Sequence, residues 1–241
     1  MTDISTARRA GAVVAWIAGI GAASYAVYVA AAWLRYGRET AAGPEDIDLL
    51  LDRFMPKYEV VERHHVGVAA PSDVTFAAFM DMDLEDSAVI RAIFRARELL
   101  LGAHAGDKPR ARGLVAMTQE LGWGVLAEVP THQIVMGAVT QPWKPDVVFR
   151  SLPPDEFAAF DEPDYVKIVW TLRADVSNTG TSIARTETRV IATDAEARRK
   201  FRWYWARFSA GIVLIRTISL RLVKKEAERR GRAVTVQRRH G

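Results

Sequence analysis

Residues 165–205, YVKIVWTLRADVSNTGTSIARTETRVIATDAEARRKFRWYW, decide the predicted fold. From residue 165 to 175, apolar side chains alternate with mostly polar neighbours, as in an antiparallel strand with one face on a core. The apolar members are Val166, Ile168, Trp170, Leu172 and Ala174. The turn SNTG at 177–180 predicts a return strand over residues 181–193. Together these features predict a β-hairpin.

A long helix follows the hairpin. Asp194 is a good N-cap, and the pattern predicts a helix from there to about residue 230. Its apolar stripe consists of Phe201, Tyr204, Trp205, Phe208, Ile212, Ile215 and Leu222. A curved antiparallel sheet around this helix would bury both the strand faces and the stripe. The predicted class is therefore α+β.

The chain upstream of the hairpin supplies the other elements. Residues 58–70 predict a first strand, and residues 74–82 and 87–102 predict two helices, the first capped by Ser72. Further strands are expected at 123–129, 132–139 and 146–150. One domain at 57–230 is expected, preceded by a linker and short amphipathic helix at 36–56 and followed by a basic tail at 231–241.

The N-terminus raises the question of a membrane. After a flank at 1–9, residues 10–34 hold 25 uncharged residues, which predicts a transmembrane helix at 10–35. Ten alanines and three glycines weaken the signal. The alternatives are a signal peptide cleaved near Ala30-Ala31-Ala32, with secretion, and a buried soluble helix. Arginines flank both ends, so the side of the membrane on which the domain lies stays open.

Charge is unevenly distributed behind a net charge of +4. Residues 1–194 carry 19 basic and 26 acidic side chains (net −7), and residues 195–241 carry 14 and 3 (net +11). The basic C-terminus is suited to binding an anionic membrane surface. Nucleic acid is the less favoured partner, although its charge would also suit this segment. The absence of cysteine excludes disulfides, thiolate metal sites and a thiol nucleophile. We expect no cofactor and no metal site.

Four segments resemble one superfamily: AAPSDVTF (69–76), GAVTQPW (137–143), RTETRV (185–190) and ARRKFRWYW (197–205). With the element order, they resemble the SRPBCC, or START-like, superfamily over about residues 57–230. Its members include polyketide cyclase-like proteins and lipid-transfer domains. The resemblance implies a helix-grip fold with an apolar cavity between sheet and long helix. It implies little about activity, because the superfamily mixes carriers and enzymes.

Arg185, Glu187 and Arg189 alternate and therefore share one face of the last strand. If residues 177–180 form a four-residue loop, these residues pair with Leu172, Trp170 and Ile168 and face the cavity. There they would bind a carboxylate or phosphate on an apolar ligand. A slip of one residue would turn them outward, and a solvated face is the alternative that the cost of buried charge favours.

Glu62 and His64 share the more apolar face of the first strand and are the candidate acid/base pair. A hydrogen-bonded, inert histidine is the alternative. The expected cavity lining is Trp123, Trp143, Trp170, Tyr204, Trp205 and Phe208, although such residues also fill ordinary cores.

The predicted function is membrane-anchored binding or transfer of a hydrophobic small molecule or lipid without catalysis. One alternative is a cyclase- or dehydratase-like enzyme that uses His64 or Glu62. The other is a non-catalytic interaction module with a filled core. The sequence leaves the ligand's identity and the oligomeric state open.

Overall fold

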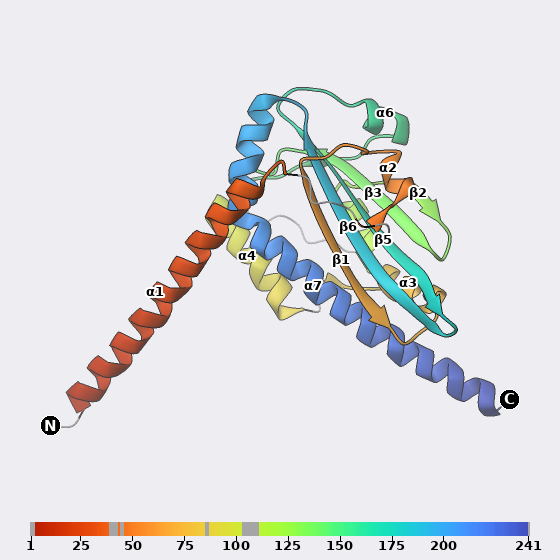
Figure 1. The fold of residues 1–241 in the computed structure, drawn as a ribbon, viewed down its shortest axis with the longest axis horizontal. Coiled ribbons are helices and arrows are strands. Elements are labelled where there is room, and N and C mark those ends of the chain that lie inside the picture. The colour runs from red at the N-terminus through yellow and green to blue at the C-terminus, as the bar shows by residue number, and fades with distance from the viewer. Residues whose placement is uncertain (1–2, 39–42, 44–45, 85–86, 103–110, 241) are drawn as a thin grey trace.

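The computed structural model describes the backbone of residues 3–38, 43, 46–84, 87–102 and 111–240, and the side chains of residue 16 and of those same ranges within 19–233. An antiparallel sheet forms one layer, and the C-terminal helix α7 (Ala195–His240) runs along it (Figure 1). The fold is α+β with a long C-terminal helix, which fits the helix-grip arrangement.

The sheet has six strands, and every pair of neighbours is antiparallel. They are β1 (Val60–Val68), β2 (Gly124–Val129), β3 (Gln133–Thr140), β4 (Phe149–Arg150), β5 (Val166–Asn178) and β6 (Thr181–Ala192). The order is β1-β6-β5-β3-β2, with β4 paired to β3. β1 is therefore an edge strand.

The helices follow the predicted order, with differences at their ends. They are α2 (Leu49–Asp52), α3 (Ser72–Met80), α4 (Ala88–Leu101), α5 (Leu114–Glu120) and α6 (Pro154–Ala159), of which α5 and α6 were not predicted. Asp194 caps α7 as expected, since its Oδ1 accepts from the Ala197 amide at 2.7 Å. The cap predicted at Ser72 was wrong, because Pro71 holds that position. α7 continues past residue 230 to His240.

Both faces of the sheet are covered. Trp170 and Leu172 lie on the inner face, in one cluster with Phe79 of α3 and Leu220 of α7. Val135, Val139 and Val169 lie on the outer face with Leu51 of α2 and Phe157 of α6. Strand alternation divides neighbouring residues between these two clusters. All eight residues of β3 are consequently buried.

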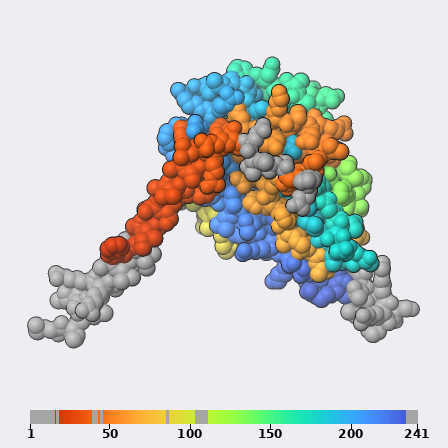
Figure 2. Space-filling model, viewed as in Figure 1, coloured from red at the N-terminus to blue at the C-terminus, as the bar shows by residue number. Residues whose placement is uncertain are grey.

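Helix α1 (Asp3–Arg35) projects from the body (Figures 1 and 2). Its base packs on α7, where the rings of Trp33 and Trp203 lie 4.5 Å apart. Trp16 and Val27 are 73% and 70% exposed. Among the residues whose side chains are described, no helix is both long and apolar enough to cross a membrane. The side chains of residues 10–15, 17 and 18 of the predicted span lie outside that description.

Candidate functional site

The hairpin between β5 and β6 has a different register from the expected one. β5 extends to Asn178, which pairs with Thr181 beside an irregularity in the register. Arg185, Glu187 and Arg189 therefore pair with Arg173, Thr171 and Val169. A one-residue slip moves side chains to the other face of a sheet. The four-residue loop that would have turned these three charges toward the interior beneath α7 does not form, and they lie on the opposite face of the sheet.

Glu187 and Arg189 are buried rather than solvated, with 7% and 3% exposed. The Arg189 guanidinium donates to Glu187 at 2.7 Å, to the Met55 carbonyl at 2.8 Å, and to Asp52. Burial pulls the pKa of Arg189 down, but hydrogen bonds and charges from Glu187 and Asp52 outweigh it and raise that pKa. A neighbouring pocket holds only about 20 Å³, enough for about one water molecule and too little for a larger ligand. These ion pairs hold α2 against the sheet, and ligand binding by the three residues stays a prediction.

The predicted lining aromatics divide between two core clusters. Trp123 and Trp170 pack edge to face with ring centroids 6.1 Å apart. Trp143, Tyr204 and Trp205 pack with the cluster around Phe201, and the rings of Phe208 and Tyr204 lie 5.0 Å apart. Trp205 alone of these six residues lines the pocket described below. A ligand role for the others stays a prediction.

Glu62 and His64 lie on the inner face of β1, as their alternation predicted. Glu62 pairs with Thr188 and His64 with Thr186, and directly paired residues share a face. The Thr188 hydroxyl accepts a 3.0 Å hydrogen bond from Arg216 of α7. The Glu62 and His64 side chains approach to 3.4 Å between Oε2 and Nε2. The buried His64 Nε2 and Thr186 Oγ1 have no hydrogen-bond partner among the described residues.

Arg216 places a cation on this inner face. Its guanidinium lies 5.4 Å from the centre of the Trp170 ring. No carboxylate of a described residue forms an ion pair with it, and burial lowers the pKa of Arg216 to about 10. The side chain therefore remains protonated at neutral pH. Sequence reasoning missed this residue, although an arginine within the apolar run GIVLIRTISL was a signal.

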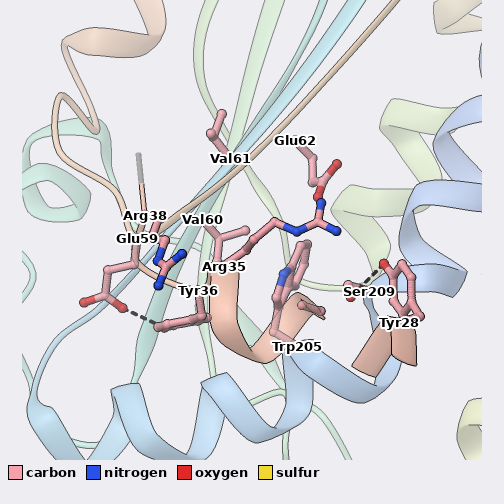
Figure 3. Close-up of a pocket in the computed structure, with 11 residues that line it drawn as sticks. Tyr28, Arg35, Tyr36, Arg38, Glu59, Val60, Val61, Glu62, Trp205 and Ser209 are labelled. Carbon is pink, nitrogen blue, oxygen red and sulfur yellow. Dashed lines mark hydrogen bonds between the residues drawn. The ribbon is translucent and has the colours of Figure 1, made fainter. Parts of the chain in front are cut away.

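A pocket of about 240 Å³ lies at the sheet edge, between the base of α1, β1 and the part of α7 that carries Trp205 and Ser209 (Figure 3). We call it the edge pocket. Its lining is Tyr28, Ala32, Arg35, Tyr36, Arg38, Glu59, Val60, Val61, Glu62, Trp205 and Ser209. Glu62 connects the edge pocket to the inner face of β1, because its carboxylate lies beside His64.

Hydrogen bonds hold α1 against the body at the edge pocket. Tyr28 Oη and Ser209 Oγ lie 3.1 Å apart, and the Tyr36 hydroxyl donates to Glu59 at 2.7 Å. Arg198 of α7 also pairs with Glu59. Burial, followed by the hydrogen bond to Glu59, raises the pKa of Tyr36 far above its ordinary value. The phenol therefore stays neutral.

Sequence reasoning missed the α1 side of this pocket because residues 10–35 were assigned to a membrane span. Tyr28 and Arg35 were thus placed in the span, and Tyr36 and Arg38 were placed in the linker at 36–56, all outside the domain. Aromatic and arginine residues gathered at the end of an apolar run were the available signal.

Comparison with known proteins found distant structural likeness only. No protein-family model and no curated protein sequence matches the chain. The ZhuI aromatase/cyclase from Streptomyces sp. R1128 is 14% identical, over 71% of this chain and 94% of that one, with a TM-score of 0.26. Protein CV1439 from Chromobacterium violaceum is 14% identical, over 64% of this chain and 96% of that one, with a TM-score of 0.25. DynU16, from the dynemicin biosynthetic locus, is 13% identical, over 64% of this chain and 45% of that one, with a TM-score of 0.24. Likeness at this level carries no inference about activity.

Proposed function

We propose that the protein binds a small amphiphilic molecule or lipid in the edge pocket without changing it chemically. The observation that carries the proposal is a pocket of about 240 Å³ with an apolar wall and polar groups, at the base of a helix with exposed apolar side chains. Small-molecule sites span about 300–1,000 Å³. The pocket lies just below that range, so it suits a small ligand or one end of a larger one.

The walls of the edge pocket match the two halves of such a ligand. Trp205, Val60 and Ala32 supply apolar surface, against which buried hydrocarbon gains about 25 cal/mol per Å². Tyr28 and Ser209 supply hydroxyl groups, and Arg35 and Arg38 supply positive charge. Because aromatic and polar groups lie side by side, the pocket can orient a ligand as well as bury it.

We also propose that α1 holds the protein at a membrane. Trp16, Ile20, Val27 and Leu34 are each at least 60% exposed on a helix that projects from the body. A bilayer would remove this apolar surface from water. The full chain is expected in the membrane pellet after a high-salt wash, and a chain beginning at residue 40 in the supernatant. The truncated chain remaining in the pellet would contradict this assignment.

The binding proposal is tested by native mass spectrometry of the full chain purified from membranes in a mild detergent. The wild type should retain a ligand. Ala32→Leu fills the pocket and should lose it, whereas Ala30→Leu makes the same change at an exposed position of α1 and should keep it. Absence of ligand from all three proteins would favour the interaction module with a filled core.

The second candidate function is a cyclase- or dehydratase-like enzyme. The 3.4 Å approach of His64 to Glu62 favours it, because Glu62 lines the edge pocket and could pass a proton to a ligand there. Arg216 would stabilise a developing oxyanion. Incubation of the extracted ligand with wild type and His64→Ala distinguishes the candidates. The binding proposal expects equal retention and no change of ligand mass, whereas turnover lost in His64→Ala would establish the enzyme.

A further inference from the structure

We infer that the ligand of the edge pocket carries an anionic head, a phosphate or carboxylate, held by Arg35 and Arg38. This inference rests on the proposed function and adds the chemical class of the ligand. Both arginines line the pocket, and neither guanidinium forms an ion pair or hydrogen bond with a described residue. Figure 3 shows the Arg35 side chain extending across the pocket toward Glu62.

One of the two carboxylates of the pocket, Glu59, already has a cationic partner. Glu59 accepts the Tyr36 hydroxyl at 2.7 Å and pairs with Arg198 of α7. Glu62 lies 3.4 Å from the His64 ring nitrogen. Among the described residues, Arg35 and Arg38 thus outnumber the one carboxylate of the pocket that has no arginine or lysine partner, Glu62. A bound anion would balance the remaining positive charge.

A purely structural role accounts for the two arginines only in part. Arg35 lies in the last turn of α1, where a cation offsets the helix dipole. Arg38 lies beyond the end of α1, where that dipole gives it no such role. Two guanidinium groups on one pocket suit the oxygens of a phosphate or carboxylate.

The position of the pocket favours an anion attached to an apolar group. Trp205, at 7% exposed, forms part of the wall beside the polar residues. The same pocket adjoins α1, whose apolar side chains are exposed. An amphiphile would place its head at the arginines and its apolar part along Trp205 and α1, whereas a free anion would leave this wall without a ligand.

The test compares two lipids that differ only in the phosphate. The full chain in neutral maltoside micelles is mixed with dioctanoyl phosphatidic acid or dioctanoylglycerol, and bound lipid is counted by native mass spectrometry. The wild type should retain phosphatidic acid at least tenfold better than dioctanoylglycerol. Arg35→Gln with Arg38→Gln should lose this preference. Arg221→Gln with Lys225→Gln makes the same charge change at exposed positions of α7 and should keep it.

Three outcomes count against the inference in different ways. Equal retention of both lipids by the wild type, or an unchanged preference in the arginine variant, overturns the anionic head and leaves the proposed function standing. No retention of either lipid, with no ligand on the purified protein, overturns the proposed function and the inference together. Displacement of phosphatidic acid by an equal concentration of inorganic phosphate overturns the lipid source. If the double variant fails to fold, Arg38→Gln alone, outside α1, should weaken the preference at least threefold.

Discussion

The Tyr36 hydroxyl donates a 2.7 Å hydrogen bond to the Glu59 carboxylate and so joins the end of α1 to the residue before β1. The Gly37 amide adds a 3.0 Å bond to the Glu59 carbonyl. One residue of the body thus receives both a side chain and a backbone amide from the α1 end. This connection fixes the α1 wall of the edge pocket against its β1 wall.

Tyr36→Phe should loosen this connection. Hydrogen bonds to charged groups contribute about 1.5–3 kcal/mol, so the free energy of unfolding in urea should fall by about that amount. Hydrogen exchange at the Gly37 amide should accelerate. Tyr25→Phe, which removes an exposed bond from α1 to the Arg207 carbonyl, is the matched control and should cost less than about 1 kcal/mol. Equal losses in the two variants would contradict a special role for Tyr36.

The same phenol predicts a dependence of stability on pH. Because burial and Glu59 raise the pKa of Tyr36, the folded state keeps a proton that the unfolded state loses above about pH 10. The contribution is complete below that pH and is lost as the pH rises further, by up to about 1.4 kcal/mol per unit. Urea unfolding at about pH 8 and pH 11 should show a steeper loss in wild type than in Tyr36→Phe. Parallel losses would show that the Tyr36 pKa is ordinary.

Glu187→Gln should destabilise the protein strongly. The change leaves Arg189, 3% exposed, and the neighbouring Arg63 without their shared carboxylate. Breaking a buried ion pair from one side costs about 3–5 kcal/mol. Glu196→Gln removes an exposed partner of Arg199 and should cost less than about 0.5 kcal/mol. A loss below about 1 kcal/mol for Glu187→Gln would show that the network on the outer face is dispensable.

Gly122→Ala should also destabilise the fold. Gly122 has a φ of +98°, and a Cβ there would lie 2.1 Å from the Phe149 carbonyl oxygen. Both the backbone conformation and this contact oppose a side chain, so we expect a loss of at least about 2 kcal/mol in urea unfolding. Gly67→Ala on β1 adds a Cβ with no atom within 4 Å and is the control. A similar stability for both variants would show that the Gly122 backbone does not lie against the Phe149 carbonyl.

Local patterns in the sequence sufficed for the long strands and for α3, α4 and α7, but they missed α5 and α6 and left the hairpin register open. Alternation identified β5 and β6, and the cap at Asp194 located the start of α7. The face of Arg189 depended on whether the loop between these strands has four residues or two, and Asn178 pairs with Thr181 instead of lying in the turn. Turn composition alone does not fix that register, because Ser, Asn, Thr and Gly suit both loops.

The candidate site was harder to predict because its walls come from distant parts of the chain. Glu62 and His64 were found, since alternation within one strand fixes their common face. Arg35 and Trp205 are 170 positions apart in sequence, yet both line the edge pocket. Their proximity follows from packing of α1 on α7, for which no local pattern exists.

Arg216→Met should raise the free energy of unfolding, by about 1–3 kcal/mol. Burial lowers the pKa of Arg216 to about 10, so below that pH the folded state carries a charge that it disfavours relative to water. Methionine removes this cost. It also loses the hydrogen bond to Thr188 and the contact with Trp170, and these losses offset part of the gain in stability. Arg207→Met, at an exposed position of the same helix, should change stability by less than about 0.5 kcal/mol.

A side chain that lowers stability in this way is typical of functional sites, so the enzyme candidate expects a more stable Arg216→Met protein without turnover. A loss of more than about 1 kcal/mol would instead show that Arg216 stabilises the core through its contacts.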